Sequence, residues 1–207
     1  MPKTNKPVRA VLFDLGMVIL RFDFGPAFRK LARSSGRRPG EIAAFFTRSG
    51  LEVLYDGGRI TSREFYRRVK RGIGHGLTYA EFCRAWNEIF TPNAGIVRLI
   101  RRLKGRTRLV LVSNTNAMHY RYIRAKYPVL GHFRRAVLSY RLKVRKPDPR
   151  IYMIAARACG ADPTEIFYID DREDLTAAAG DLGFRTFTFK NNLKDLLRRM
   201  AELEIAC

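Results

Sequence analysis

The sequence predicts an α/β fold: a doubly wound parallel sheet with a small all-helical cap inserted after the first strand. Three observations predict it. Short apolar runs that fit buried strands alternate with amphipathic stretches that fit helices. Several of these runs end in polar residues, as strands do at the ligand-binding edge of such sheets. Between residues 23 and 91 strand-like runs are missing, and helical patterns follow one another. The predicted sheet is Rossmann-like, with right-handed crossovers.

The first strand covers residues 8–13, a β-branched and apolar run that fits a strand buried on both faces. It ends on Asp14, and Gly16 allows a sharp turn and a close approach of the backbone to a ligand. We expect the core to comprise residues 1–22 and 92–207. Its later elements are a helix at 93–104, strands near 109–112 and 137, a helix at 151–158, a strand at 166–169, a helix at 175–182, a strand at 184–189 and a helix at 193–205.

The cap, expected over residues 23–91, is predicted to contain roughly four helices. Such a regular segment is too long for a loop. Apolar spacing indicates helices around 28–32 and 42–46, a glycine loop at 56–58, a helix capped by Thr61 or Ser62, and a helix over 79–90.

The composition is that of a globular domain. The 207 residues are 46% hydrophobic and 29% charged, and no apolar run approaches the roughly 20 residues that span a bilayer. No apolar core of a secretory signal follows the start, so we expect no membrane association. Cys83, Cys159 and Cys207 are odd in number and lack metal-binding spacing, which favours a reducing cytoplasm.

The formal net charge of +21 suits a protein that attracts polyanions. It also suits helices whose polar sides carry arginine. The basic residues are spread along the chain, and no nucleic-acid-binding fingerprint accompanies them. Nucleic acid therefore stays an alternative partner that no motif supports.

A set of polar residues at the predicted strand ends has the composition of a phosphoryl-transfer site. Paired carboxylates hold Mg²⁺, a carboxylate can attack phosphorus, and lysine and backbone N–H groups stabilise the charge on the phosphoryl oxygens. A lysine also stands in a proline-bounded loop before a helix. The set is Asp14, Ser113, Asn114, Lys146, Asp170 and Asp171.

Four motifs resemble those of the haloacid dehalogenase superfamily of hydrolases, over nearly the full chain. Residues 13–19, Phe-Asp-Leu-Gly-Met-Val-Ile, match the first motif, and residues 112–116, Val-Ser-Asn-Thr-Asn, match the second. Residues 146–152, beginning Lys-Pro-Asp-Pro, match the third, and residues 167–171, Phe-Tyr-Ile-Asp-Asp, match the fourth. Residues 58–65 of the cap are similar to a branch that includes bacterial glucose-1-phosphate phosphatases and the phosphatase domain of epoxide hydrolases.

The resemblance implies a role for each motif residue. Asp14 would be the nucleophile and a metal ligand, and Gly16 would offer its carbonyl oxygen to Mg²⁺. Ser113 and Asn114 would bind phosphoryl oxygens. The remaining roles are charge neutralisation by Lys146, metal ligation by Asp171, and support or alternative ligation by Asp170.

Two positions depart from the family pattern. Most phosphatases of the superfamily have a second aspartate as acid and base where this chain has Gly16, and general acid–base help contributes about 10²–10⁴ in rate. We hypothesise that Asp23 supplies this proton or holds a water that does. Leu175 replaces an asparagine near the metal, and Asp174 is its neighbour.

These features predict a Mg²⁺-dependent phosphatase for a small phosphorylated metabolite, such as a sugar phosphate, that acts through an aspartyl-phosphate. One alternative is a dehalogenase on the same fold, which needs no metal. Another is a catalytically weak or silent protein that binds polyanions. The sequence leaves the substrate and the oligomeric state open.

Overall fold

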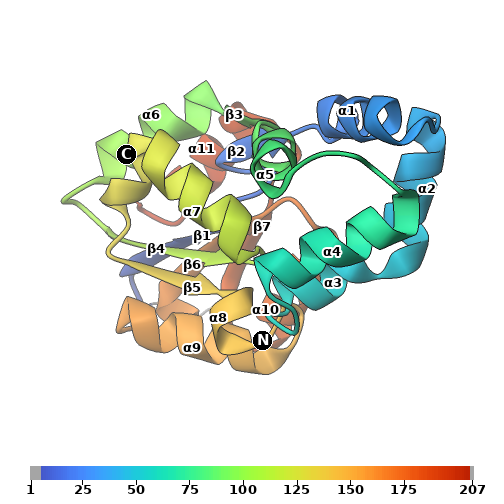
Figure 1. Cartoon of the computed structure of the whole chain (residues 1–207). Helices are drawn as coiled ribbons and strands as arrows, with labels where there is room; N and C mark the ends of the chain where they lie inside the picture. Colours follow the sequence, from blue (N-terminus) through green and yellow to red (C-terminus); the bar gives the residue numbers. More distant parts are fainter. Residues whose placement is uncertain (1–5, 206–207) are drawn as a thin grey trace.

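A five-stranded parallel sheet forms the centre of the molecule, in a computed structural model that describes residues 6–205 (Figure 1). The strand order is β5-β4-β1-β6-β7. The order places β1, the first strand, in the middle, between β4 and β6, whose carboxyl ends carry residues of the second and fourth motifs. The strands are β1 (Ala10–Phe13), β4 (Arg108–Ser113), β5 (Arg135–Leu138), β6 (Ile166–Asp170) and β7 (Arg185–Thr188).

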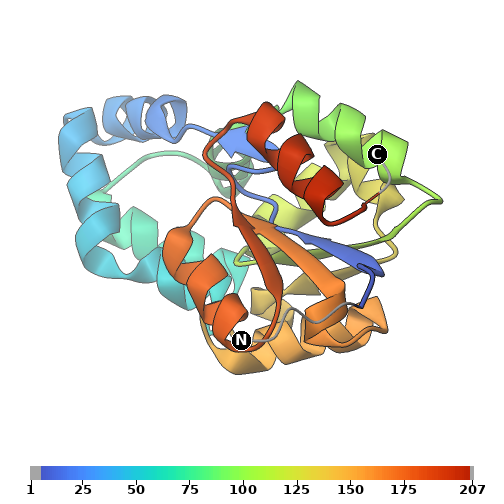
Figure 2. The ribbon, with the colours of Figure 1, turned by 180° about the vertical axis from the view of Figure 1, so that it is seen from behind.

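Helices cover both faces of the sheet, which explains why β1 is fully buried along its length. One face packs against α6 (Ala94–Leu103), α7 (Ala117–Lys126) and α11 (Leu193–Glu202). The other packs against α9 (Pro149–Cys159) and α10 (Glu173–Asp181). The view from behind shows β7 at the sheet edge between α10 and α11 (Figure 2). Three short helical segments connect these elements: η1 (Pro128–His132), α8 (Ser139–Leu142) and η2 (Pro163–Glu165).

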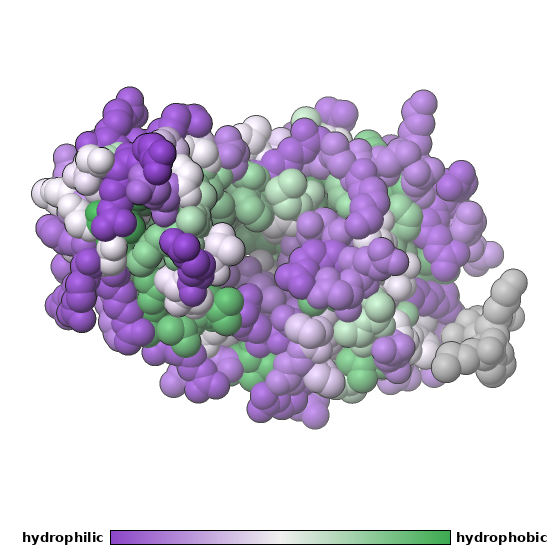
Figure 3. Space-filling model, turned by 90° about the vertical axis from the view of Figure 1, so that its right-hand side faces the viewer, coloured by the Kyte–Doolittle hydropathy of each residue, from purple (hydrophilic) through white to green (hydrophobic). Residues whose placement is uncertain are grey.

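The cap is a bundle of helices around its own apolar core, which contains Phe65, Phe82 and Trp86. Figure 3 views the cap side of the molecule, where hydrophilic residues cover much of the surface and apolar residues gather near the middle. Its helices are α1 (Gly25–Ser35), α2 (Pro39–Ser49), α3 (Leu51–Asp56), α4 (Ser62–Ile73) and α5 (Tyr79–Asn87).

A two-stranded antiparallel ribbon links cap and core. It pairs β2 (Leu20–Phe22), where the chain leaves the core, with β3 (Phe90–Pro92), where it returns. The ribbon thus lies on both boundaries expected from the sequence, while the assignment of 1–22 and 92–207 to a core and 23–91 to a cap stays a prediction.

The predicted α/β fold is confirmed, and several details differ. The cap has five helices within the described residues where roughly four were predicted, because the short α3 precedes the glycine loop. The predicted helix over 79–90 ends at Asn87, and Phe90 belongs to β3 because it pairs with Phe22. No helix within residues 6–205 combines the length and the apolar character needed to cross a bilayer.

Candidate active site

The carboxyl ends of the three central strands bring the predicted site residues together. The backbone N–H of Asp14 donates to the carbonyl oxygen of Ile169 (2.9 Å), which extends the β1–β6 pairing by one residue. Asp14 and Asp170 therefore end neighbouring strands, and both side chains are buried. Ser113 ends β4 on the other side of β1 and is also buried.

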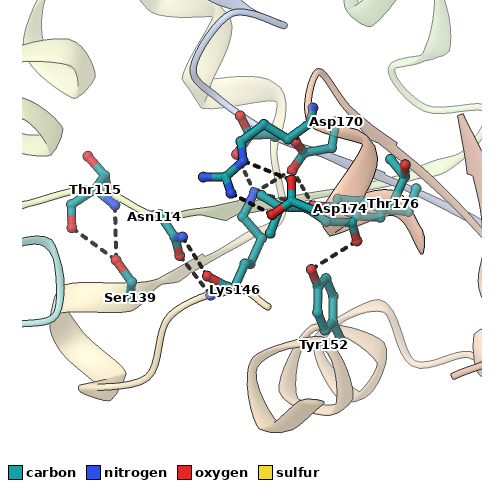
Figure 4. Close-up of polar contacts among 12 residues, drawn as sticks. Asn114, Thr115, Ser139, Lys146, Tyr152, Asp170, Asp174 and Thr176 are labelled. Carbon is teal, nitrogen blue, oxygen red and sulfur yellow. Dashed lines mark hydrogen bonds and ion pairs between the residues drawn. The ribbon is translucent and has the colours of Figure 1, made fainter. Parts of the chain in front are cut away.

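Lys146 reaches this edge from the loop before α9, and Asn114 fixes that loop. The Asn114 side chain accepts a hydrogen bond from the Lys146 backbone N–H and donates one to the Lys146 carbonyl oxygen, each at 2.9 Å (Figure 4). Because both groups of the Asn114 side chain are occupied, this side chain positions Lys146. The backbone N–H of Asn114 makes no hydrogen bond to another residue of the described range, so it is the group of Asn114 left to bind a ligand.

The Lys146 ammonium lies between two carboxylates. Its Nζ is 2.6 Å from Asp14 Oδ1 and 2.6 Å from Asp170 Oδ2. Tyr168 completes the group, because its hydroxyl is 3.2 Å from Lys146 Nζ and donates a short hydrogen bond to Asp170 Oδ2. The other Asp170 oxygen accepts from the Arg172 backbone N–H (3.0 Å). Asp170 is thus fully hydrogen-bonded, and it holds Lys146 beside Asp14.

Burial and charge act in opposite directions on these groups. Burial is the largest influence on Asp14 and raises its pKa, the Lys146 ammonium opposes this, and Asp170 and Asp171 add to it. Burial lowers the pKa of Lys146, but Asp14 and Asp170 more than compensate, so this pKa lies above its ordinary value. Lys146 is therefore a buried ammonium ion at neutral pH, and it supplies the positive charge next to Asp14.

Three carboxylates at this edge fit a divalent cation. One oxygen each of Asp14, Asp170 and Asp171 lies within 4.8 Å of the others. Burial and the neighbouring Asp170 raise the pKa of Asp171, which shows that these acids repel one another without a cation. Asp171 is half-buried, and its carboxylate receives no hydrogen bond from another described side chain. This donor set of carboxylate oxygens matches what Mg²⁺ prefers.

A cavity lies between these strand ends and the cap. On the core side it is lined by Gly16, Ser113 and Asn114, and on the cap side by Glu52 and Asp56. No hydrogen bond joins the backbone N–H of Gly16 or of Asn114 to another residue in the described range 6–205. Two free N–H groups beside a serine residue make an anion-binding arrangement.

Polar contacts fasten the cap over this cavity. The Asn116 amide donates to Asp56 Oδ1 (3.0 Å), and the Ser139 hydroxyl donates to the Asp56 carbonyl oxygen (2.6 Å). The Met118 backbone N–H donates to the Tyr55 hydroxyl (3.1 Å). These contacts join α3 of the cap to the start of α7 and to α8, so the cap is seated on the strand ends.

His119 is a packed residue of this junction. Its Nε2 lies 3.0 Å from the Trp86 carbonyl oxygen and its Nδ1 lies 3.2 Å from the Asn116 amide nitrogen, which defines a neutral ring with the proton on Nε2. Burial lowers its pKa to about 4. A neutral donor to a carbonyl oxygen cannot serve as an acid at physiological pH, so His119 connects cap and core.

The structure does not bring Asp23 into the group around Lys146. The Asp23 carboxylate is exposed, accepts from the Gly25 backbone N–H (2.8 Å) and is not part of the cavity lining. Its role in proton transfer stays a hypothesis. At position 16, a Cβ atom would lie 3.1 Å from the Phe22 ring, so this ring occupies space beside Gly16. The Gly16 carbonyl oxygen, the predicted metal ligand, accepts from the Val18 N–H (2.7 Å).

The second departure from the motif pattern has no local substitute. Leu175 is buried, and its carbonyl oxygen accepts from the Tyr152 hydroxyl (3.0 Å). Asp174 is exposed and pairs with Arg172 (2.5 Å), so it does not replace the missing amide (Figure 4).

Sequence reasoning missed three contributors to this site: Tyr168, Asn116 and Glu52. Tyr168 stands two residues before Asp170 in the strand, and alternation along a strand places both on one face. This two-residue spacing could have indicated from the sequence that Tyr168 lies beside Asp170. Asn116 and Glu52 belong to separate parts of the chain, and only the seating of the cap brings them to one cavity.

The chain matches known proteins along most of its length. The family model described as haloacid dehalogenase-like hydrolase matches residues 8–183. The D-ribitol-5-phosphate phosphatase of Bacteroides thetaiotaomicron is 24% identical over 191 residues, which cover 89% of this chain and 93% of that protein. The phosphorylated carbohydrates phosphatase of Thermotoga maritima is 24% identical over 199 residues, covering 91% of this chain and 88% of that protein.

Solved structures resemble this one closely. A HAD family enzyme of Bacteroides thetaiotaomicron, in complex with magnesium and inorganic phosphate, superimposes with a TM-score of 0.80 at 27% identity, covering 88% of this chain and 94% of its own. The L-2-haloacid dehalogenase of Xanthobacter autotrophicus has a TM-score of 0.66 at 17% identity, and the superposition covers 97% of this chain and 85% of the dehalogenase chain. The second likeness concerns the fold alone.

Proposed function

Because the chain belongs to the haloacid dehalogenase-like hydrolases, we propose that it is a Mg²⁺-dependent phosphatase of small phosphorylated sugars or sugar alcohols. The observation that carries the proposal is the buried Lys146 ammonium, 2.6 Å from Asp14 at the end of the central strand and within one cluster with Asp170 and Asp171. The named activities of the two phosphatase relatives support the substrate class.

The proposed reaction has two steps, each at the phosphorus atom. In the first, a carboxylate oxygen of Asp14 attacks phosphorus while the bond to the alcohol oxygen breaks, which leaves an aspartyl-phosphate and an alkoxide. In the second, water attacks phosphorus, and the Asp14 carboxylate and inorganic phosphate are released. Lys146, Ser113 and the free N–H groups of Gly16 and Asn114 would hold the phosphoryl oxygens and stabilise their charge.

A Mg²⁺ ion held by Asp14, Asp171 and the Gly16 carbonyl would screen the repulsion between the attacking carboxylate and the phosphoryl group. Asp170 would keep Lys146 in place through its 2.6 Å ion pair. Because position 16 carries no acid, we expect esters of acidic alcohols to react faster than sugar phosphates. Substitution Asp23→Asn tests the hypothesis that Asp23 supplies the proton: unchanged hydrolysis of a sugar phosphate would reject it.

The experiment that tests the proposal is a phosphate-release screen over sugar phosphates, sugar-alcohol phosphates, nucleotides and phosphorylated acids, with Mg²⁺ and with EDTA. We expect Mg²⁺-dependent release that the Asp14→Asn variant lacks. Halide release from a 2-haloacid without metal would favour the dehalogenase alternative. Failure to hydrolyse any ester, together with salt-sensitive binding of RNA or DNA, would favour the polyanion-binding alternative.

A further inference from the structure

Glu52 lies in the same cavity as the groups proposed to bind the phosphoryl group. It belongs to α3 of the cap and lines the same cavity as Gly16, Ser113 and Asn114. Within residues 6–205, no hydrogen bond or ion pair reaches its carboxylate. Asp56, one helical turn later, is engaged by Asn116 at 3.0 Å. Glu52 is therefore the acid of the cavity whose hydrogen-bonding capacity is left for a ligand.

The surroundings make this carboxylate unusual. The chain has 40 lysines and arginines, yet none of them lines the described cavity. Its acidic lining residues are Glu52 and Asp56, and its other ionisable lining residues, His119 and Tyr55, are neutral at physiological pH because burial lowers the pKa of His119 to about 4 and raises the pKa of Tyr55 to about 12. Burial, with Asp56 adding repulsion, raises the pKa of Glu52 to about 7. A second negative charge brought into this part of the cavity meets repulsion from these acids in their ionised form, and for Glu52 that form predominates above pH 7.

The rest of the lining suits an uncharged organic group. Phe24 and Trp86, whose ring centroids are 4.9 Å apart, belong to the lining together with Phe22 and Phe90. Trp86 is 1% exposed, and its indole Nε1 has no hydrogen-bond partner in the described part of the chain. Apolar rings accompanied by unsatisfied polar groups are typical of a site for a small polar ligand.

We propose that Glu52 is a specificity-determining residue, which accepts a hydrogen bond from a hydroxyl group of the leaving alcohol and repels phosphomonoesters that carry a second anionic group. The inference rests on the proposed function, because it takes the phosphoryl group to lie against Gly16 and Asn114. A molecule bound in that way has its remaining part in the cavity that Glu52 lines. The selected substrates are neutral polyol phosphates, and the rejected ones are phosphorylated acids.

A matched pair of ligands tests this role: D-ribitol 5-phosphate and 5-phospho-D-ribonate, which differ only by a hydroxymethyl group against a carboxylate. Discrimination is the ratio of their kcat/KM values, measured with Mg²⁺ above pH 7, where Glu52 is mostly ionised, in the wild type and in Glu52→Gln. The variant keeps the side-chain size and removes the charge. We expect the wild type to favour the polyol ester and Glu52→Gln to lower the ratio by about tenfold or more, as for one buried charge interaction.

Glu88→Gln is the matched control, because Glu88 is an exposed residue of the cap that lies outside the cavity lining. It removes the same charge and should leave the ratio unchanged. An equal ratio in the wild type and Glu52→Gln, or an equal fall in both variants, would overturn the proposal.

Binding measurements separate this proposal from the proposed function. Calorimetric titration of both ligands into Asp14→Asn and into Asp14→Asn/Glu52→Gln, with Mg²⁺, gives the discrimination without turnover. If the wild type releases no phosphate but the binding ratio still depends on Glu52, the proposed reaction fails and the specificity role stands. If phosphate is released and the binding ratio does not depend on Glu52, the specificity role fails alone.

Discussion

At the scale of single residues, the site depends on groups that hold one ammonium ion in place. Two carboxylates share Lys146, and one of them, the buried Asp170, has further hydrogen-bond partners. The Tyr168 hydroxyl and the Arg172 N–H support Asp170, one on each of its oxygens. A buried charge cluster is stabilising only when its remaining hydrogen-bonding capacity is satisfied in this way.

Substitution Tyr168→Phe tests this support. We expect the free energy of unfolding to fall by about 1.5–3 kcal/mol, because a hydrogen bond to a charged group is lost, and kcat to fall with it. Tyr152→Phe is the control: its hydroxyl donates to a neutral carbonyl oxygen, so the loss should be about 0.5–1.5 kcal/mol with kcat unchanged. Urea unfolding and steady-state kinetics measure both. Equal effects of the two substitutions on kcat would contradict a positioning role for Tyr168.

The lowered pKa of His119 should make the stability of the protein depend on pH. Its pKa falls from 6.5 in the unfolded chain to about 4 in the fold, so the unfolded chain binds the proton more readily. Its contribution is therefore complete above pH 6.5 and is lost as the pH falls to about 4, by about 3 kcal/mol in total. Urea unfolding of the wild type and His119→Gln across this range gives the difference. A difference that does not change with pH would contradict the prediction.

Single residues were predictable where a motif fixes the backbone position. Asp14, Lys146, Asp170 and Asp171 were identified from the sequence, and the structure places them together at one sheet edge. Asn114 was assigned to the phosphoryl group, but its side chain binds the Lys146 backbone, 32 residues away. No local pattern indicates such a long-range partner. The contact of its side chain became visible only once the loop was placed, and phosphoryl binding by Asn114 stays a prediction that now concerns its backbone N–H.

At the scale of elements, the loop after α3 makes a close contact between cap and core. Gly58 has a φ of +64°, and a Cβ atom there would lie 2.1 Å from the Tyr140 carbonyl oxygen of α8. Asp56, the last residue of α3 directly before this loop, binds Asn116. A glycine at position 58 is therefore needed both for the turn and for the close approach of the two backbones.

Gly58→Ala and Gly36→Ala separate these two needs. Gly36 has almost the same φ of +66° and no atom within 4 Å of an added Cβ. We expect Gly36→Ala to lower the free energy of unfolding by about 1–2 kcal/mol from left-handed strain alone. Gly58→Ala should cost about 1–3 kcal/mol more from the clash, and it should raise KM because the cap no longer seats. Equal losses in urea unfolding would show that the contact is unimportant.

Elements with their own periodicity were predictable, and those that depend on distant pairing were not. The amphipathic α6 follows its predicted range within one residue at each end. The ribbon of β2 and β3 was missed, because each strand has three residues, one contains Pro92, and their pairing joins segments about 70 residues apart in the sequence. Neither segment has enough residues for a strand pattern to be recognised.

At the scale of the whole molecule, the charge imbalance sets the response to salt. There are 40 basic and 19 acidic residues, so the basic residues outnumber the acidic ones by 21. Most of the ion pairs formed by the described residues are exposed, and exposed pairs contribute little. Salt weakens these attractions and also the general repulsion among the cations. With so large an excess of one sign, relief of repulsion is the larger effect.

We therefore expect the urea midpoint to rise as NaCl increases from about 0.01 M to about 0.15 M, over which the Debye length falls from about 30 Å to about 8 Å. Most proteins stabilised by surface ion pairs would respond in the opposite direction. Screening depends only on ionic strength, so replacing chloride by another monovalent anion should give the same shift. A rise that depends strongly on the anion would instead indicate bound anions, and a falling midpoint would show that the attractive pairs outweigh the net charge of +21.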